Sequence, residues 1–183
     1  GIKLSTLGYA IPGIILAIGL LVPLTYVDHF IAEPISDVLG GRPRLWMTGS
    51  MTALIIVYVA RFLAVSYNST ESGMAQIDKT FDEAANVLGA RPRTILRRIH
   101  FPLLRGSLIT GFLLVFIDIV KELPATLIMR PFNFDTLSTR IYRFASDERL
   151  SEASIECLLI IGLGILLSVL LISSSKKSLL ENI

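Results

Sequence analysis

Cysteine is almost absent from this chain, which has one, Cys157, among 183 residues. A lone cysteine has no partner within the chain, so disulfides cannot hold the fold. Charged residues are also scarce, at 17%, and they divide evenly into 17 basic and 15 acidic side chains. Nucleic-acid binding depends on clustered positive charge that neutralises phosphates. The composition therefore predicts no nucleic-acid partner.

The motifs of common enzymes are missing as well. No G-x-x-x-x-G-K-[ST] loop occurs, so the chain cannot cradle a nucleoside triphosphate in that way. The two histidines, His29 and His100, have no second ligand at a metal-like spacing, and His100 is predicted to be solvated or interfacial. No nucleophile stands beside a base in any recognised pattern. We expect no catalytic residue, no cofactor and no metal site.

Long apolar runs are what the chain does have, since 52% of its residues are hydrophobic. They predict an all-α, polytopic transmembrane helical bundle forming a single domain over residues 1–183. About four spans are expected, at residues 4–27, 45–65, 106–125 and 156–175. The first contains no charge, and its 24 residues would reach about 36 Å as a helix, enough to cross a bilayer core. The first run also lacks a small-residue cleavage site, so no signal peptide is expected.

Two prolines and a pair of small residues mark the first span. Pro12 and Pro23 each remove a backbone donor, which lipid tolerates only where a neighbouring helix or water compensates. Gly13 and Ala17 have the small-xxx-small spacing that allows close helix packing. Such residues are also simply common in membrane helices, and the sequence favours neither explanation.

Charges inside or beside the spans have two explanations each. Arg61 lies in the second span, and snorkelling to the headgroups is favoured over a functional intramembrane charge. If the third span is one straight helix to Ala125, then Asp118, Lys121 and Glu122 lie at or below the far headgroups. Asp118 and Lys121 could neutralise each other there, whereas Asp118 and Glu122 would repel. The three side chains are either a translocation-pathway cluster or, as we favour, a marker of the interface.

The remaining polar segments are expected outside the membrane. Residues 28–44 form a connecting loop, and Asp135 is a possible N-cap of a short helix with Arg140 and Arg143 on a solvated face. A mouth of a pathway would also suit those two arginines. Ser151 and Glu152 are start signals for the last span.

The polar passage from residue 70 to 102 predicts two helices joined by an elbow. In the first, apolar residues recur at three- and four-residue intervals, with Ser72 as N-cap and Gly89 as C-cap. In the second, Pro92 occupies the first turn, Ile95 and Ile99 share one face, and Pro102 ends the helix.

Four spans place both termini and this elbow on one side of the membrane. That side carries nine Lys and Arg residues, against seven on the other when Arg61 is left out. The positive-inside rule favours a cytoplasmic elbow by this margin.

The elbow resembles the signature of membrane-spanning permease subunits of binding-protein-dependent ABC importers. That signature is E-A-A, three residues, Gly, nine residues, then I-x-L-P. The chain matches it at Glu83, Ala84, Ala85, Gly89, Ile99 and Pro102 and departs from it at Phe101, where the family has Leu. The resemblance implies that these six residues dock onto a cytoplasmic ATP-binding subunit.

Further stretches resemble ferric-iron ABC permeases in particular. They are the segments 8–13, 121–127 and 130–137, and the resemblance covers nearly the whole chain. It implies a bacterial inner-membrane protein that receives ferric iron from an extracytoplasmic solute-binding protein. It also implies that this chain is most of a C-terminal half that works with a second permease half.

Two other functions remain open at this point. A permease for thiamine, sulfate, phosphonate or polyamine would share the same elbow. A secondary transporter or channel without an ATPase would explain Asp118, Lys121 and Glu122 but would leave the elbow without a role.

Overall fold

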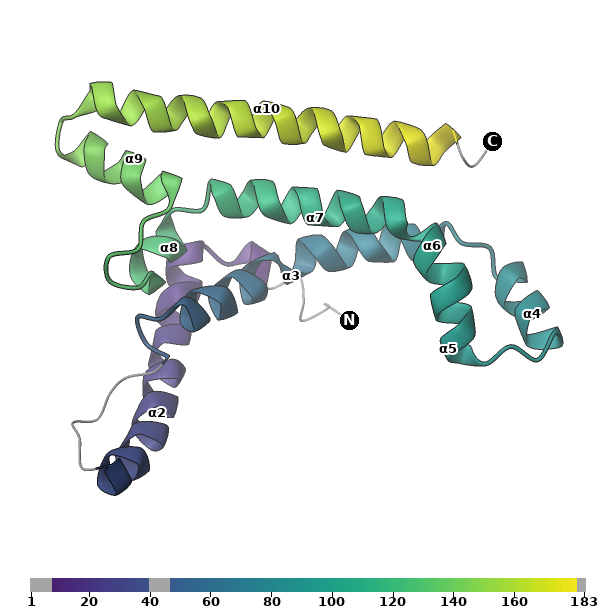
Figure 1. Ribbon diagram of the computed structural model, residues 1–183, viewed down its shortest axis with the longest axis horizontal. Helices are drawn as coiled ribbons and strands as arrows, with labels where there is room; N and C mark the ends of the chain where they lie inside the picture. Colours follow the sequence, from purple (N-terminus) through teal and green to yellow (C-terminus); the bar gives the residue numbers. More distant parts are fainter. Residues whose placement is uncertain (1–7, 40–46, 181–183) are drawn as a thin grey trace. The chain divides into compact units, whose positions relative to one another are not determined.

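A computed structural model describes residues 8–39 and 47–180, with side chains described for residues 8–31 and 47–173 (Figure 1). The regular secondary structure of the described residues is all helical, with no strand among them. The all-α prediction is therefore confirmed. The beginning of the first predicted span, residues 40–46 with Arg42 and Arg44, and the last three residues lie outside the described part. So do the side chains of Lys176 and Lys177.

The chain folds as two compact units. The first comprises residues 1–64 and 118–163, and the second comprises residues 65–117 and 164–183. Three long helices continue from one unit into the other: α3 (Met51–Ala75), α7 (Arg105–Val120) and α10 (Leu150–Leu180).

Three helices in the described part are long and apolar enough to cross a membrane, over Gly13–Ile31, Met51–Ala75 and Leu150–Ser173. A fourth crossing is possible where the run Pro92–Leu103 meets α7 at a bend of 65°. The number of spans agrees with the prediction, but the helix bounds do not. The second helix runs ten residues past 65, and the last begins six residues before 156.

The first helix, α2, spans Gly13–Leu39 and is longer than expected. The helix is interrupted at Ile11 and Pro12 and then continues beyond residue 27. The predicted loop at 28–44 is therefore wrong for residues 28–39. Asp28 explains the difference. Its carboxylate is fully buried and accepts the backbone N–H groups of Met47 and Thr48 at 2.7 and 2.6 Å. The charge is satisfied by peptide donors and does not require a solvated loop.

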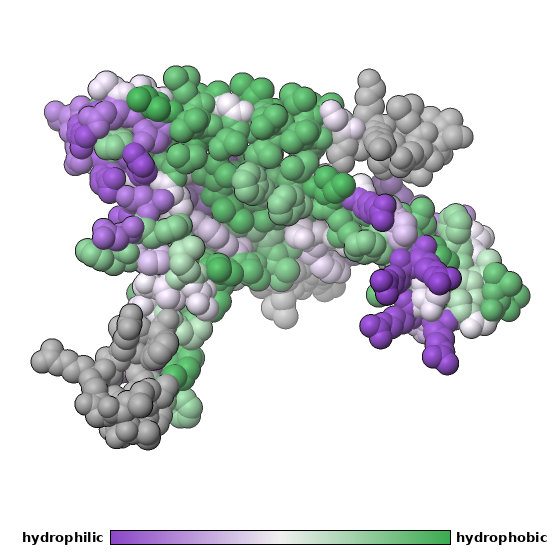
Figure 2. All heavy atoms as spheres, in the orientation of Figure 1, coloured by the Kyte–Doolittle hydropathy of each residue, from purple (hydrophilic) through white to green (hydrophobic). Residues whose placement is uncertain are grey.

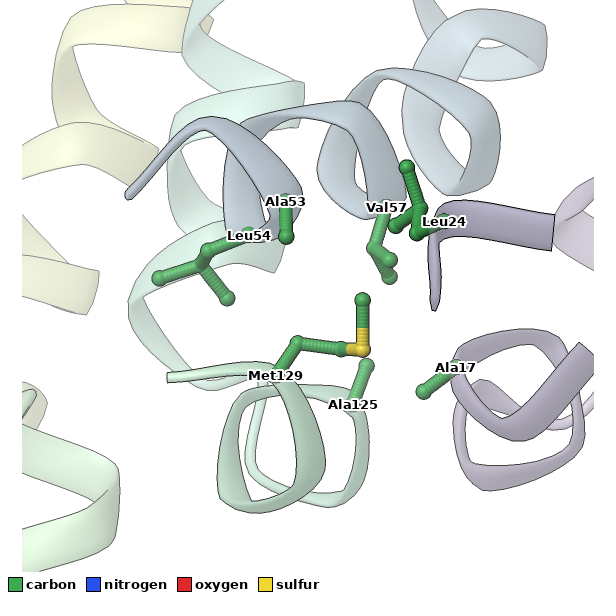
Figure 3. Close-up of a cluster of buried hydrophobic side chains, with 7 residues drawn as sticks. All are labelled: Ala17, Leu24, Ala53, Leu54, Val57, Ala125 and Met129. Carbon is green, nitrogen blue, oxygen red and sulfur yellow. The ribbon is translucent and has the colours of Figure 1, made fainter. Parts of the chain in front are cut away.

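The core of the first unit lies where α2, the start of α3 and the short helix α8 (Pro124–Met129) meet (Figure 3). It contains Ala17, Leu24, Ala53, Leu54, Val57, Ala125 and Met129. Three of these seven are alanines with no exposed surface. Small side chains allow helix backbones to approach closely, which is how helices associate in lipid. Gly13 and Ala17, the predicted small-residue pair, are both buried in this unit.

The first unit also contains α9 (Leu137–Ser146). Thr136, not Asp135, caps it, through a capping box with Thr139. Asp135 instead forms ion pairs with Arg130 and Arg143. Arg140 and Arg143 are both exposed, as predicted for a solvated face, and Arg140 also pairs with Glu156 at 2.9 Å.

Candidate functional site

The elbow, defined here as residues 78–104, lies in the second unit and connects α3 to α7 (Figure 1). Its first arm is α4, Thr80–Val87. Its second arm is a continuous helical run made of α5 (Pro92–Ile95), a π-helical turn (Leu96–His100) and α6 (Phe101–Leu103). The two-helix prediction is confirmed, with different boundaries.

The first arm starts at Asp78, which corrects the prediction of Ser72. Ser72 lies inside α3, and its hydroxyl donates to the carbonyl of Asn68 at 2.8 Å. The Asp78 carboxylate accepts the backbone N–H of Thr80 at 2.9 Å. This bond, with one from the Thr80 hydroxyl, lowers the pKa of Asp78. The carboxylate therefore stays ionised at neutral pH and can start the helix.

Gly89 ends the first arm, as predicted. Its φ is +70°, a conformation that glycine adopts without the strain other residues meet. The N–H of Ala90 reaches the carbonyl of Ala85 at 3.0 Å, and the N–H of Gly89 reaches Asn86 at 2.9 Å. These two bonds form a Schellman motif. A side chain at Gly89 would meet nothing within 4 Å, so backbone conformation rather than space demands glycine.

The second arm does not stop at Pro102, which corrects another prediction. The helix widens before the proline, where the N–H of Phe101 donates to the carbonyl of Leu96, five residues back. In a regular α-helix the ring of Pro102 would clash with the carbonyl of Arg98, and its missing N–H would leave that carbonyl without a partner. A π-turn relaxes this conflict and lets the run continue into α6.

A hydrogen bond ties the two arms together. Asp82 on α4 and His100 on the second arm lie 2.8 Å apart, Oδ1 to Nε2. His100 is 8% exposed, so of the two predicted positions, solvated or interfacial, the solvated one is wrong. Its Nδ1 is buried without a hydrogen-bond partner. The pair therefore connects the two arms across the turn, between residues 18 apart in sequence.

The six motif residues do not all face one way. Glu83, Ala84, Gly89 and Pro102 are exposed, Ile99 is half-buried and Ala85 is buried. The Glu83 carboxylate has no hydrogen-bond or ion-pair partner among the residues that the structure describes. Two large apolar side chains at the tip, Val87 and Leu88, are 88% and 85% exposed. An exposed apolar tip beside a free carboxylate is typical of a surface that binds another protein.

Both ends of the elbow are held by close helix packing within the second unit. Ser69 on α3 donates to the carbonyl of Ser107 on α7 at 2.7 Å. A Cβ on Gly73 would lie 2.5 Å from the Cβ of Ser107, and one on Gly111 would lie 3.1 Å from that of Ser69. The first contact leaves room only for glycine, and the second is tight enough that Ser69 would have to move to admit a side chain. The base of the elbow is therefore held by close packing of α3 against α7.

A second cluster of charges lies in the first unit. The Arg61 Nε donates to Glu122 Oε2 at 2.9 Å, and its Nη1 donates to the carbonyl of Ile11 at the same distance. Side-chain exposure is 18% for Arg61 and 7% for Glu122, so Arg61 does not snorkel and that prediction is wrong. Glu122 also accepts the N–H of Ala125 at 3.2 Å. Arg61 thus connects α3 to two helix interruptions, one at Ile11 before α2 and one at Glu122 between α7 and α8.

The predicted cluster of three charges is divided by the end of α7. The helix stops at Val120 rather than at Ala125, because Pro124 starts the new helix α8. The Ser138 hydroxyl donates to the freed carbonyl of Val120 at 2.6 Å. Asp118 and Lys121 pair at 2.8 Å, as predicted, while Glu122 turns to Arg61. The expected repulsion between Asp118 and Glu122 is thus relieved by a second cation.

Sequence reasoning missed two of these relationships. Arg61 and Glu122 are opposite charges in apolar surroundings. Because charged residues within a membrane usually pair with one another, the sequence could have predicted this pair. Asp82 and His100 had no comparable signal, because an aspartate and a histidine on different helices are brought together by the turn at Gly89.

A family model described as the inner membrane component of binding-protein-dependent transport systems matches residues 4–179. The chain belongs to this family. It is a component of a transporter and a multi-pass inner-membrane protein.

The chain is also similar to permeases with named cargo. It is 24% identical over 159 residues to the Fe(3+)-transport system permease protein FbpB 2 of Haemophilus influenzae, covering 87% of this chain and 28% of that protein. Identity to the ferric transport system permease protein FbpB of Actinobacillus pleuropneumoniae is 26%, over 68% of this chain and 18% of that protein. A putative 2-aminoethylphosphonate transport system permease, PhnV of Salmonella typhimurium, is 23% identical, over 73% and 50%. The chain spans at most about half the length of these relatives.

Proposed function

We propose that this chain is part of the permease of an ABC importer and that the elbow docks onto a cytoplasmic ATP-binding subunit. The observation that carries the proposal is the exposed tip of the elbow, where Val87, Leu88 and the unpaired Glu83 project beside the turn at Gly89. Docking would bury apolar surface that is otherwise exposed to water. The Asp82–His100 bond and the tight packing of α3 against α7 would carry the subunit's movement into the bundle.

Ferric iron is the cargo that we propose. The relatives that match the largest part of this chain include a permease named for Fe(3+), and others are named for ferric transport. The second candidate is a small phosphonate, which the similarity to PhnV favours. The cargo would arrive from an extracytoplasmic binding protein and cross at an interface with a second permease half.

For the pathway itself we propose Asp118 and Lys121, with Glu122 as a brace. The Lys121 side chain is 63% exposed, whereas both oxygens of the Glu122 carboxylate already accept hydrogen bonds from Arg61 and Ala125. Lys121→Ala is expected to change the KM for uptake while ATP hydrolysis stays coupled.

The docking proposal is tested in the full-length permease, co-expressed with its ATP-binding subunit. Glu83→Arg and Gly89→Pro should abolish both co-purification of that subunit and uptake of labelled ferric iron, with membrane insertion unchanged. Glu148→Arg, a charge reversal of an exposed acid outside the elbow, and Gly89→Asn, which tolerates positive φ, are the controls. Normal coupling in the Glu83 and Gly89→Pro variants would rule the proposal out. Competition by 2-aminoethylphosphonate distinguishes the two cargoes.

A further inference from the structure

Five exposed arginines follow the turn of the elbow. They are Arg91, Arg93, Arg97, Arg98 and Arg105, called here the arginine face. No ion pair or hydrogen bond joins any of their side chains to another residue in the described part of the chain. Hydrophilic side chains gather visibly over the second arm (Figure 2). The arginine face is therefore a concentration of positive charge that the fold leaves uncompensated.

The sequence makes local compensation impossible. No Asp or Glu occurs between Glu83 and Asp118, a stretch that contains all five arginines. The nearest acid on the first arm, Asp82, is already bonded to His100. Arginines elsewhere differ, since each one between residues 130 and 149 has an acidic partner. Those partners are Asp135 for Arg130 and Arg143, Glu156 for Arg140 and Glu152 for Arg149.

The arginine face lies on the side that the count of basic residues favours as cytoplasmic. Counting all basic residues gives nine against seven, a small excess on the elbow side. Counting arginines without an acidic partner, among residues whose side chains the structure describes, leaves the five of the arginine face and none in the segment 130–149. Clusters of basic residues next to a membrane helix favour the cytoplasmic side, where anionic lipids attract them.

The bend between the second arm and α7 would place the arginines of the arm near headgroup depth if α7 crosses the membrane. The arm is inclined by 65° to α7. With α7 along the membrane normal, the arm lies 25° (90° − 65°) from the membrane plane. Arg93 is ten residues before Leu103, or about 15 Å along the arm, and so only about 6 Å below the start of α7. The headgroup layer is about 5–7 Å thick on each side of the core.

The side chains on the arm suit that position. Phe101 and Leu103, at the end nearest α7, are 54% and 50% exposed and would meet the boundary of the acyl chains. The guanidinium groups farther along the arm have the geometry that binds phosphate oxygens bidentately. A tilt of α7 by about 20° would shift Arg93 by about 5 Å, a distance that its long side chain can span.

We propose that the arginine face binds the headgroups of anionic phospholipids in the cytoplasmic leaflet. The second arm is thereby held on the membrane surface, and the tip with Val87 and Leu88 is left free for a protein partner. This interaction requires no ATP-binding subunit, so it can be measured apart from the docking proposed above. An acidic surface on that subunit is the competing partner for the same arginines.

The test uses the full-length permease in mixed micelles, without the ATP-binding subunit, titrated with a fluorescent phosphatidylglycerol. The double variant Arg93→Gln with Arg97→Gln should weaken binding by roughly fivefold per arginine, about 25-fold in all. Arg143→Gln with Arg149→Gln also removes two charges, but both are already ion-paired, so it should bind like wild type. Thermal melts establish that each variant is folded. A zwitterionic phosphatidylcholine probe should show no such difference.

Two results would overturn the proposal. One is equal phosphatidylglycerol binding by the wild type and the Arg93/Arg97 double variant. The other is a loss of ATP-binding-subunit affinity in that double variant when no anionic lipid is present, which would assign the arginine face to the subunit. Arg93→Lys with Arg97→Lys keeps the charge but loses the bidentate geometry, and it should retain most of the lipid binding.

Discussion

Arg61 and Glu122 form a buried ion pair, with Nε and Oε2 2.9 Å apart, and it connects the second membrane helix to the break between α7 and α8. Neither charge could be left alone in these surroundings. Arg61 also satisfies the carbonyl of Ile11, exposed where Pro12 interrupts the helix. One guanidinium thus compensates both a carboxylate and a broken helix.

Removing one partner should therefore be costly. Glu122→Ala leaves Arg61 buried without a counter-ion and should destabilise the protein by about 3–5 kcal/mol. Asp118→Ala breaks the neighbouring pair with Lys121, whose side chain is 63% exposed, and should cost at most about 1 kcal/mol. Thermal unfolding of the two variants in the same detergent compares them directly. Equal losses would mean that the buried pair contributes no more than the exposed one.

Gly13 is predicted to be required for that ion pair. A Cβ there would lie 2.7 Å from Glu122 Oε1 and 3.1 Å from the Arg61 guanidinium. Gly13→Ala should therefore displace the pair and destabilise the protein by about 1–3 kcal/mol. Gly19→Ala is the matched control, because it lies in the same helix with nothing within 4 Å of the added carbon, and it should raise stability by up to about 1 kcal/mol. Destabilisation by both variants would point to a general intolerance of α2.

The parts that the sequence could predict are those with a local cause. The turn at Gly89 was predictable because a glycine after an amphipathic run commonly ends a helix. Glycine adopts the positive φ that this helix end requires. The apolar runs were predictable because lipid demands them. The ends of α7 and α2 were not predictable, because they depend on hydrogen-bond partners distant in sequence. Asp28 marks a polar loop in the sequence, yet distant backbone amides at Met47 and Thr48 keep it inside a helix.

Pro102 illustrates the same limit within the elbow. A proline predicts a helix end, and the chain instead inserts a π-turn that preserves the arm. Tertiary contacts favour this continuation of the helix through Pro102, because Ile95 and His100 on the second arm are buried. Propensity is a weak prior that such packing overrides.

The Asp82–His100 bond should be required for coupling rather than for folding. His100→Ala and Asp82→Ala each remove a bond worth about 0.5–1.5 kcal/mol, and this frees the two arms from each other. Amide hydrogen exchange in α4 should accelerate, and substrate-stimulated ATP hydrolysis should fall. His29→Ala, at an exposed position in α2, is the control and should change neither.

A double-mutant cycle then separates the bond from its two residues. If Asp82 and His100 act through one another, the double variant should be no worse than either single variant. Additive losses of stimulated ATP hydrolysis would mean that the two residues act independently, and the bond would not set the angle of the elbow.

The packing of α3 against α7 offers the last prediction, because it fixes the base of the elbow. A Cβ on Gly73 would lie 2.2 Å from the Ser107 hydroxyl oxygen and 2.5 Å from its Cβ, and the Cβ cannot rotate away. Gly73→Ala should therefore force the two helices apart, at a cost of about 1–3 kcal/mol, and weaken coupling of ATP hydrolysis to uptake. Gly164→Ala, in α10 with nothing within 4 Å, should leave both stability and coupling at or above wild type. The double variant Gly73→Ala with Ser107→Gly restores the space between the helices. It should recover coupling if close packing of α3 against α7 transmits the movement of the elbow. Failure of that rescue, with stability restored, would mean that the elbow acts on the bundle by another route.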